Sequence, residues 1–287
     1  MVVVGKVLSA LHVALYSYIK PGAPHRYSLD NKPYEYMNLG FGLTSLVWDI
    51  ARDFQRLSRG EIGLPDIRLG LRIDQALRTS LARYGVLPPL DLVFSVILAA
   101  STISYGMVRR EESVSAYKKA LDDVLMASTT RDAIEVYESL RKLGYHGEIE
   151  LLELNGVSRS AIEIHGYKIP DLFSVLEREY AFFKYASPYK KTIVEVSEAI
   201  ASEYEGSRSI NNAVVRGYIE LIVREGELRE YRNRIRKIVE LKLTRTRNGL
   251  RELYSLDKEL RGKGYDFERL LAPLVLAVAI ASPTIPL

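Results

Sequence analysis

The sequence contains no cysteine among its 287 residues, and glutamine occurs only at Gln55 and Gln75. The lack of cysteine excludes disulfides, thiolate metal sites and cysteine nucleophiles. P-loop, GxGxxG, HExxH and nucleophile-elbow patterns are also missing, so the usual sequence signatures of nucleotide hydrolases, dinucleotide enzymes and zinc proteases are lacking. Scarce glutamine combined with abundant Arg, Lys and Glu resembles the composition of proteins from hot environments.

Hydrophobic residues make up 47% of the chain and charged residues 26%, which is typical of a globular protein. The first residues lack the basic head of a secretory signal, so we expect a cytoplasmic protein. Residues 92–108 carry no charge, but this run is shorter than the ~20 residues that span a bilayer. We therefore predict a buried central helix at 92–108 and no membrane association.

Helical periodicity dominates the sequence and predicts a single all-α domain over 1–287, with about ten helices. The clearest segment is 129–144, where Thr129 or Thr130 can cap a helix, Asp132 favours its first turn and Gly144 ends it. Residues 147–171 break this pattern because Glu and apolar residues alternate there. That alternation predicts a hairpin or a small irregular, β-like insert.

The stretch IKPGAPHRYSL, residues 19–29, follows the first apolar helix and places several polar side chains around a proline-glycine turn. Gly22 permits positive φ, Lys20 and Arg26 supply charge, and His25 can donate a hydrogen bond or move a proton. One interpretation is an anion-binding turn. The alternative is a proline-stiffened connection with exposed polar residues.

Two stretches, KPGAPHRYSLDNKPYEYM and STTRDAIEVYESLRKLG, resemble the triphosphoribosyl-dephospho-CoA synthase family, in particular its archaeal members. The resemblance implies an all-α transferase fold that joins ATP to dephospho-CoA with displacement of adenine. It implies a phosphorylated small-molecule ligand, with Lys20, Gly22, Arg26 and Tyr27 binding substrate. His25 lies among these residues and is the candidate catalytic residue, because it can donate a hydrogen bond or move a proton. No metal-ligand spacing occurs in the sequence, so we expect no protein-bound metal, and Mg²⁺ only as a companion of a nucleotide.

The sequence departs from this family where an Asn-Thr motif would precede an apolar helix, because it reads RYGVLPPLDLVFSV there. Pro88 and Pro89 offer neither a side-chain hydrogen bond nor a backbone donor. We therefore expect a nucleotide- or coenzyme-like ligand to bind without the transfer reaction. If the chain is active, the resemblance makes it a transferase of this type.

A different function is suggested by the basic C-terminal part of the chain. Residues 207–263 hold 15 Arg and Lys against 8 Asp and Glu, and residues 229–251 hold nine against two. Such a segment indicates either a nucleic-acid or protein partner, or only a solvated helix face. His12, His146 and His165 are scattered without metal-ligand spacing, and Asp30, Asp122 and Asp123 are the remaining acidic candidates.

Overall fold

The computed structural model describes residues 1–28 and 31–287, and every regular element in these residues is a helix. The sixteen α-helices of the described residues are α1 (Val2–Tyr16), α2 (Lys32–Gly42), α3 (Thr44–Ser58), α4 (Leu69–Tyr84), α5 (Leu90–Val108), α6 (Val114–Met126), α7 (Thr130–Leu143), α8 (His146–Leu154), α9 (Arg159–His165), α10 (Ile169–Leu176), α11 (Ala181–Ala186), α12 (Thr192–Ser207), α13 (Ile210–Glu225), α14 (Arg232–Glu240), α15 (Arg247–Gly262) and α16 (Leu271–Ile280). Short 3₁₀ turns are η1 (Leu64–Ile67), η2 (Arg229–Tyr231), η3 (Leu243–Arg245) and η4 (Glu268–Leu270). The all-α prediction is confirmed.

Two apolar helices, α5 and α16, form the centre of the fold. They pack against each other, and α1, α3, α4, α6 and α12 pack around them. By length and composition α5 could cross a membrane, but 78% of its most apolar window is buried inside the protein. All ten residues of α16 are buried as well. The predicted central helix is therefore confirmed, because a charge-free helix is stable in water only when other helices cover it.

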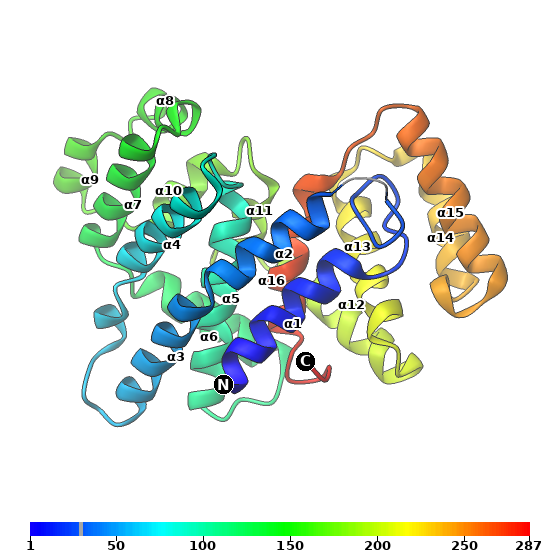
Figure 1. The fold of residues 1–287 in the computed structure, drawn as a ribbon, viewed down its shortest axis with the longest axis horizontal. Helices are drawn as coiled ribbons and strands as arrows, with labels where there is room; N and C mark the ends of the chain where they lie inside the picture. The colour runs from blue at the N-terminus through cyan, green and yellow to red at the C-terminus, as the bar shows by residue number, and fades with distance from the viewer. Residues whose placement is uncertain (29–30) are drawn as a thin grey trace.

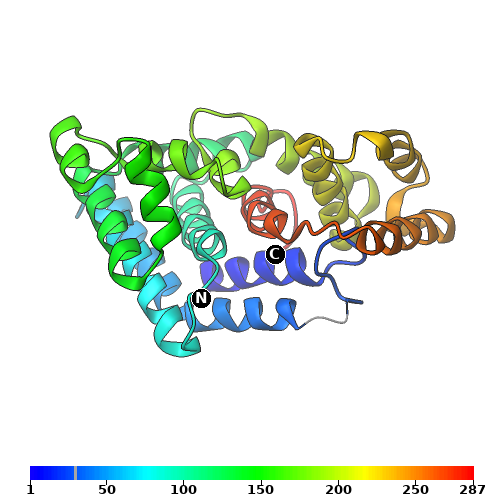
Figure 2. The same ribbon diagram turned by 90° about the horizontal axis from the view of Figure 1, so that it is seen from above.

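Two groups of helices lie on either side of this centre. In Figure 1, α3, α4 and α7 to α10 lie on the left, and α12 to α15 lie on the right, with α14 and α15 at the outer end. Figure 2 shows α16 (red) in the middle of the molecule, next to α1 (dark blue). Residues 17–28, which follow α1, reach toward the right-hand helices in Figure 1. The predicted anion-binding turn therefore lies beside Asp257 and Phe267, near the far end of the chain.

The prediction of a β-like insert at 147–171 is wrong, because these residues form α8, α9 and α10. Each helix is short, so its one-sided pattern looks like alternation. In α8 and α9 only Leu152 and Ile162 are fully buried. The helical signals were nevertheless present, since Ser158 caps α9 and Gly166 ends it with φ +67°. Glu and Leu are also strong helix formers.

The capping prediction for α7 is confirmed. Thr129 is the N-cap residue, and its hydroxyl accepts the Asp132 backbone N–H at 3.3 Å. The Asp132 carboxylate accepts the Thr129 N–H in return, at 2.8 Å. Gly144 ends the helix with φ +94°, as the sequence indicated.

Candidate functional site

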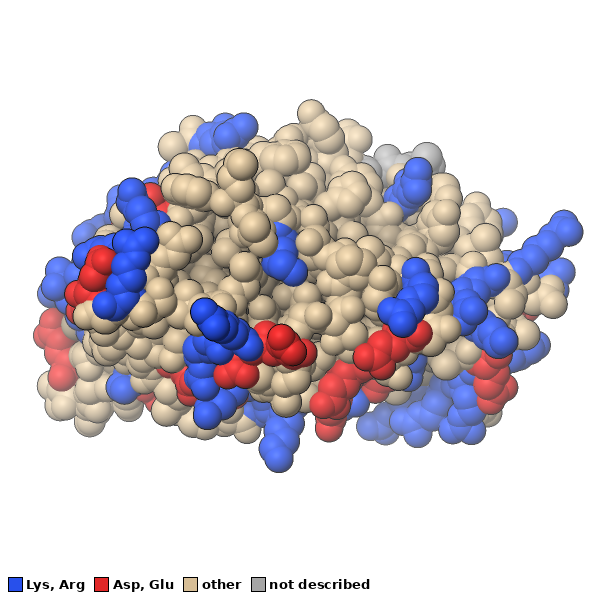
Figure 3. Space-filling view, turned by 90° about the horizontal axis from the view of Figure 1, so that it is seen from below, with Lys and Arg blue, Asp and Glu red and all other residues tan. Residues whose placement is uncertain are grey.

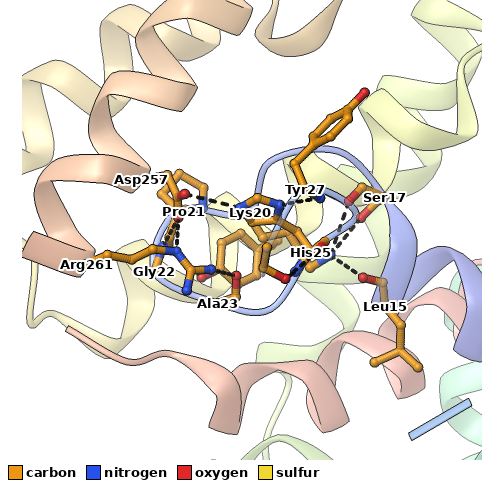
Figure 4. A network of polar contacts seen from close by, with 12 residues as sticks. Leu15, Ser17, Lys20, Pro21, Gly22, Ala23, His25, Tyr27, Asp257 and Arg261 are labelled. Atoms are coloured by element: carbon orange, nitrogen blue, oxygen red, sulfur yellow. Dashed lines mark hydrogen bonds and ion pairs between the residues drawn. The ribbon is translucent and has the colours of Figure 1, made fainter. Parts of the chain in front are cut away.

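Lys20 turns inward at the end of α1 instead of facing solvent. Its side chain is fully buried, and its ammonium donates to the carbonyls of Leu15 at 2.9 Å and Ser17 at 3.3 Å. Figure 4 shows these contacts. Burial lowers the pKa of Lys20 to about 7. The group therefore satisfies the last carbonyls of a helix, which otherwise lack partners.

His25 is also buried, and both of its ring nitrogens have partners. The Tyr27 N–H donates to Nδ1 at 3.1 Å, so Nε2 carries the proton and donates to Asp257 at 3.2 Å. Burial alone would raise the pKa of Asp257. Hydrogen bonds from His25 and the Gly22 N–H, together with the charge of Arg261, outweigh burial and lower it.

Gly22 completes this attachment of the turn to the C-terminal part of the chain. Its N–H donates to Asp257 at 2.8 Å, and its carbonyl accepts the Phe267 N–H at 2.8 Å. Around it, Arg261 donates to the Ala23 carbonyl at 2.5 Å and the Tyr218 hydroxyl donates to that of Pro21 at 2.7 Å. In Figure 4 the turn lies against Asp257 and Arg261 of α15. The turn is thus a rigid link between distant parts of the sequence.

Of the five site residues predicted from sequence, only Arg26 and Tyr27 are exposed. Tyr27 stacks on Tyr18 with 5.7 Å between ring centroids. Within the described residues Arg26 makes no hydrogen bond or ion pair. Gly22 lies beside a hollow of about 280 Å³, which Lys32 and Glu268 also line.

A larger surface, which the sequence did not suggest, lies where α2, α5, α8 and α11 meet. Three neighbouring hollows of about 450, 270 and 470 Å³ all include Pro89 in their lining. Tyr36 lines the first two of them, and Asp91 and Tyr180 line the last two. We call this surface the central groove. The first hollow is lined largely by apolar residues, among them Leu39, Leu87 and Pro88.

Asp91 lies in the first turn of α5 and is the central polar group of the groove. Its carboxylate accepts the Leu92 N–H at 2.9 Å. A helix N-terminus ordinarily favours the ionised form, but here burial dominates and raises the pKa of Asp91 to about 6. A carboxyl that exchanges its proton near neutral pH is suited to acid–base chemistry or to pH-dependent binding.

Tyrosines and glutamates surround Asp91. The Tyr145 hydroxyl donates to the Pro88 carbonyl at 2.8 Å, and the Tyr180 hydroxyl donates to Glu148. Burial raises the pKa of both phenols. Next in size is the charge of Glu148 for Tyr145 and the hydrogen bond to Glu148 for Tyr180. Both hydroxyls therefore stay protonated at neutral pH and fix the walls of the groove.

At the other end of the groove, Glu268 accepts hydrogen bonds from both Lys32 and Tyr36. Because Lys32 and Glu268 also line the hollow beside Gly22, the groove and the turn share a border. Arg269, which pairs with Glu227, supplies a second cation. Across residues 1–28 and 31–287, no three His, Asp or Glu side chains come together to hold a metal ion.

The other sequence candidates lie in different places. His146 lines the groove, His12 stacks on Tyr16, and His165 is exposed. Asp122 pairs with Lys118 and Asp123 with Arg109, while Asp30 lies outside the described residues. Asp91 was missed, although an isolated acid next to a long charge-free run was a usable signal.

The fold is similar to a crystal structure from Archaeoglobus fulgidus described as a "putative triphosphoribosyl-dephospho-coA synthase". The two chains share 16% identity with a TM-score of 0.48, and the similarity covers 86% of this chain and 99% of the other. No protein-family model matches the sequence, and a comparison with curated proteins gave no significant match.

Proposed function

We propose that the chain binds a phosphorylated small molecule of the nucleotide or coenzyme type in the central groove. The observation that carries the proposal is the shared border formed by Lys32 and Glu268. It joins the groove to the turn whose residues resemble those of a phosphoribosyl-transferring family. Each hollow has a size near the ~300–1,000 Å³ of small-molecule sites, and apolar walls with few polar groups are typical of them.

The groove suits a planar ring near Asp91. Tyr36, Tyr180 and Pro89 provide flat surfaces for stacking. The carboxylates of Asp91 and Glu148 accept hydrogen bonds, which matches a heterocycle that carries an amino group. The same carboxylates repel phosphate, so the anionic part of the ligand points away from them.

The phosphate end of the ligand lies toward Lys32 and the turn. Cations bind phosphate, and Arg26 is an exposed cation on this turn. A Mg²⁺ ion bound to the phosphates would reduce their charge there. Lys20 and His25 contribute indirectly in this proposal, since their contacts hold the turn in place.

Calorimetric titration of the full chain with ATP and with dephospho-CoA tests this proposal. We expect saturable binding of at least one of them. Tyr36→Ala should weaken binding about ten-fold because a stacking surface is lost, while Tyr36→Phe should retain it. Arg26→Ala should weaken binding of the phosphorylated ligand but not of its unphosphorylated nucleoside.

Tyr254→Ala is the matched control, because Tyr254 is an exposed tyrosine on α15. It should leave the affinity for either ligand unchanged. Absence of binding by both ligands at millimolar concentration, or equal weakening by the Tyr36 and Tyr254 variants, would remove the groove as the site.

A further inference from the structure

The outward face of α15 carries a stripe of polar side chains at helical spacing. Arg247, Arg251, Tyr254 and Lys258 follow one another at intervals of four, three and four residues, and all four are exposed. Intervals of three and four place residues on one side of a helix. The buried residues Leu253, Leu256 and Leu260 lie on the opposite side. At 1.5 Å per residue the stripe is about 16 Å long.

The positive charge of this stripe is not neutralised by the acids of the same helix. Glu259 pairs with Arg234 of α14 at 2.6 Å and with Lys263 at 3.2 Å, and Glu252 lies 3.6 Å from Arg234. These acids therefore neutralise Arg234 and Lys263 instead of the cations of the stripe. In the described part of the chain, the three cations of the stripe form no ion pair or hydrogen bond.

Further cations extend the surface beyond the start of α15. Arg245 donates to the Gly206 carbonyl at 3.5 Å, which brings it beside the turn that carries the exposed Arg208. Figure 3 shows Lys and Arg side chains gathered at the right-hand end of the molecule, where α14 and α15 lie in Figure 1. This end lies outside the central groove, whose lining residues come from other helices.

We propose that this face of α15 binds a single-stranded nucleic acid. Uncompensated cations at regular spacing follow a phosphate backbone, and an aromatic ring among them stacks an unpaired base. Tyr254 is 57% exposed in the middle of the stripe and lies outside the hydrophobic core. A duplex keeps its bases stacked and would not use this ring.

Two other polyanionic partners fit the stripe less well. A helix that lies on a membrane buries Leu, Phe or Trp in the lipid, and the four stripe positions hold no aliphatic side chain. An acidic protein would meet the cations but would leave the exposed ring of Tyr254 without a base to stack on.

Fluorescence anisotropy with labelled oligouridylate and oligothymidylate of about 16 nucleotides tests the proposal on the full chain. We expect binding that weakens steeply between about 50 and 200 mM salt. Joint replacement of Arg247, Arg251 and Lys258 by alanine should reduce the slope of log K against log salt by about 2, at ~0.7 per lost phosphate contact. Tyr254→Ala should weaken binding about 5- to 100-fold, and Tyr254→Phe should not.

The control removes three exposed cations elsewhere, Lys119, Arg131 and Lys142 of α6 and α7, and has the same net charge as the stripe variant. It should keep the affinity, as should Tyr36→Ala in the groove. A preference between the two oligonucleotides identifies whether RNA or DNA is bound, and either result supports the proposal.

Four results would refute single-strand binding at this face. They are no binding at about 50 mM salt, equal weakening by the control, tighter binding of duplex with no effect of Tyr254→Ala, and binding of vesicles with anionic lipid in place of oligonucleotide. Because Tyr36 and Tyr254 serve as each other's controls, this proposal and the small-molecule proposal fail independently.

Discussion

His25 donates a hydrogen bond from Nε2 to Oδ2 of Asp257, at 3.2 Å, although the two residues stand 232 positions apart in the sequence. The pair joins the turn after α1 to α15. Both side chains are almost fully enclosed, with 1% and 9% exposure. Such a pair holds its elements together strongly, because removal of one partner leaves the other buried without compensation.

His25→Ala should therefore lower the free energy of unfolding by about 2–4 kcal/mol, measured by urea denaturation. His165→Ala is the control, because His165 is exposed and its removal should change stability by less than about 0.5 kcal/mol. If His25→Ala were as stable as this control but lost ligand binding, His25 would act in the site itself.

The same pair predicts that the stability of the fold decreases at acid pH. The pKa of Asp257 is lowered in the folded chain, so the unfolded chain binds more protons just below the ordinary value of 3.8. The stabilisation from Asp257 is thus present above that value and is lost as the pH falls through the folded pKa. The difference in urea midpoint between parent and Asp257→Asn should consequently shrink as the pH falls below 3.8, compared with its value at pH 7.

Gly22→Ala should destabilise the fold through both conformation and contact. Gly22 has φ +75°, and an added Cβ would lie 2.8 Å from the Phe267 ring. Gly85 has φ +69° but no atom within 4 Å of such a Cβ. We expect a cost of about 1 kcal/mol for Gly85→Ala and at least about 2 kcal/mol for Gly22→Ala by thermal denaturation. Equal costs would show that the Phe267 contact relaxes.

Local signals in the sequence predicted the parts of the fold that depend on neighbours in the chain. The charge-free run of α5 and the Thr129 cap of α7 are examples, because hydrophobic period and capping act within a few residues. Short helices such as α9 gave too few turns to reveal their period.

The candidate site could be predicted only in part, for a physical reason. Lys20 and His25 were recognised as special, but their burial depends on α13, α15 and Phe267, which lie far away in the sequence. Charge in a sequence does not show which side chains remain in water. The behaviour of Asp91 likewise depends on burial that no pattern of its neighbours encodes.

The buried Lys20 predicts how the stability of the fold changes with pH. Its pKa falls from 10.5 to about 7 on folding, so between these values the unfolded chain binds more protons and stability rises with pH. The free energy of unfolding of the parent, minus that of Lys20→Met, should therefore rise by about 1–3 kcal/mol between pH 7 and pH 9. Urea denaturation measures both. Lys119→Met, at an exposed position of α6, should show no such gain. A flat difference for Lys20→Met would mean that the amine stays protonated.

Asp91 makes stability depend on pH in the opposite direction to Lys20. Its pKa rises from 3.8 to about 6 on folding, so the folded chain binds more protons in that window and stability falls as the pH rises through it. Asp91→Asn should thus become more stable relative to the parent as the pH increases from 4 to 7. Thermal denaturation across this range measures the difference.

Ligand binding should follow the same ionisation. Above about pH 6 the ionised Asp91 accepts hydrogen bonds from an amino group, so affinity should rise from pH 5 to pH 7 in the parent and stay level in Asp91→Asn. A stability difference that changes as expected, with no change in affinity, would place Asp91 outside the ligand contact.

The final prediction concerns chemistry. Displacement of adenine from ATP develops positive charge on the ribose and negative charge on the base, and each preorganised polar group that stabilises such charge is worth about 2.7–4 kcal/mol. Pro88 and Pro89 line the groove where the resemblance would place an Asn-Thr pair, and the Pro88 carbonyl already accepts the Tyr145 hydroxyl.

Asp91 is then the main group left near the ring for proton transfer, and one such group supplies only part of the barrier reduction that an enzyme needs. With ATP and dephospho-CoA at concentrations that saturate the groove by calorimetry, we expect adenine release no faster than in buffer, measured by chromatography. Adenine formation at about 1 s⁻¹ or faster that Asp91→Asn or Arg26→Ala abolishes would contradict this expectation. It would show that the groove supplies the missing stabilisation through groups other than the replaced pair, and that the chain is a working transferase.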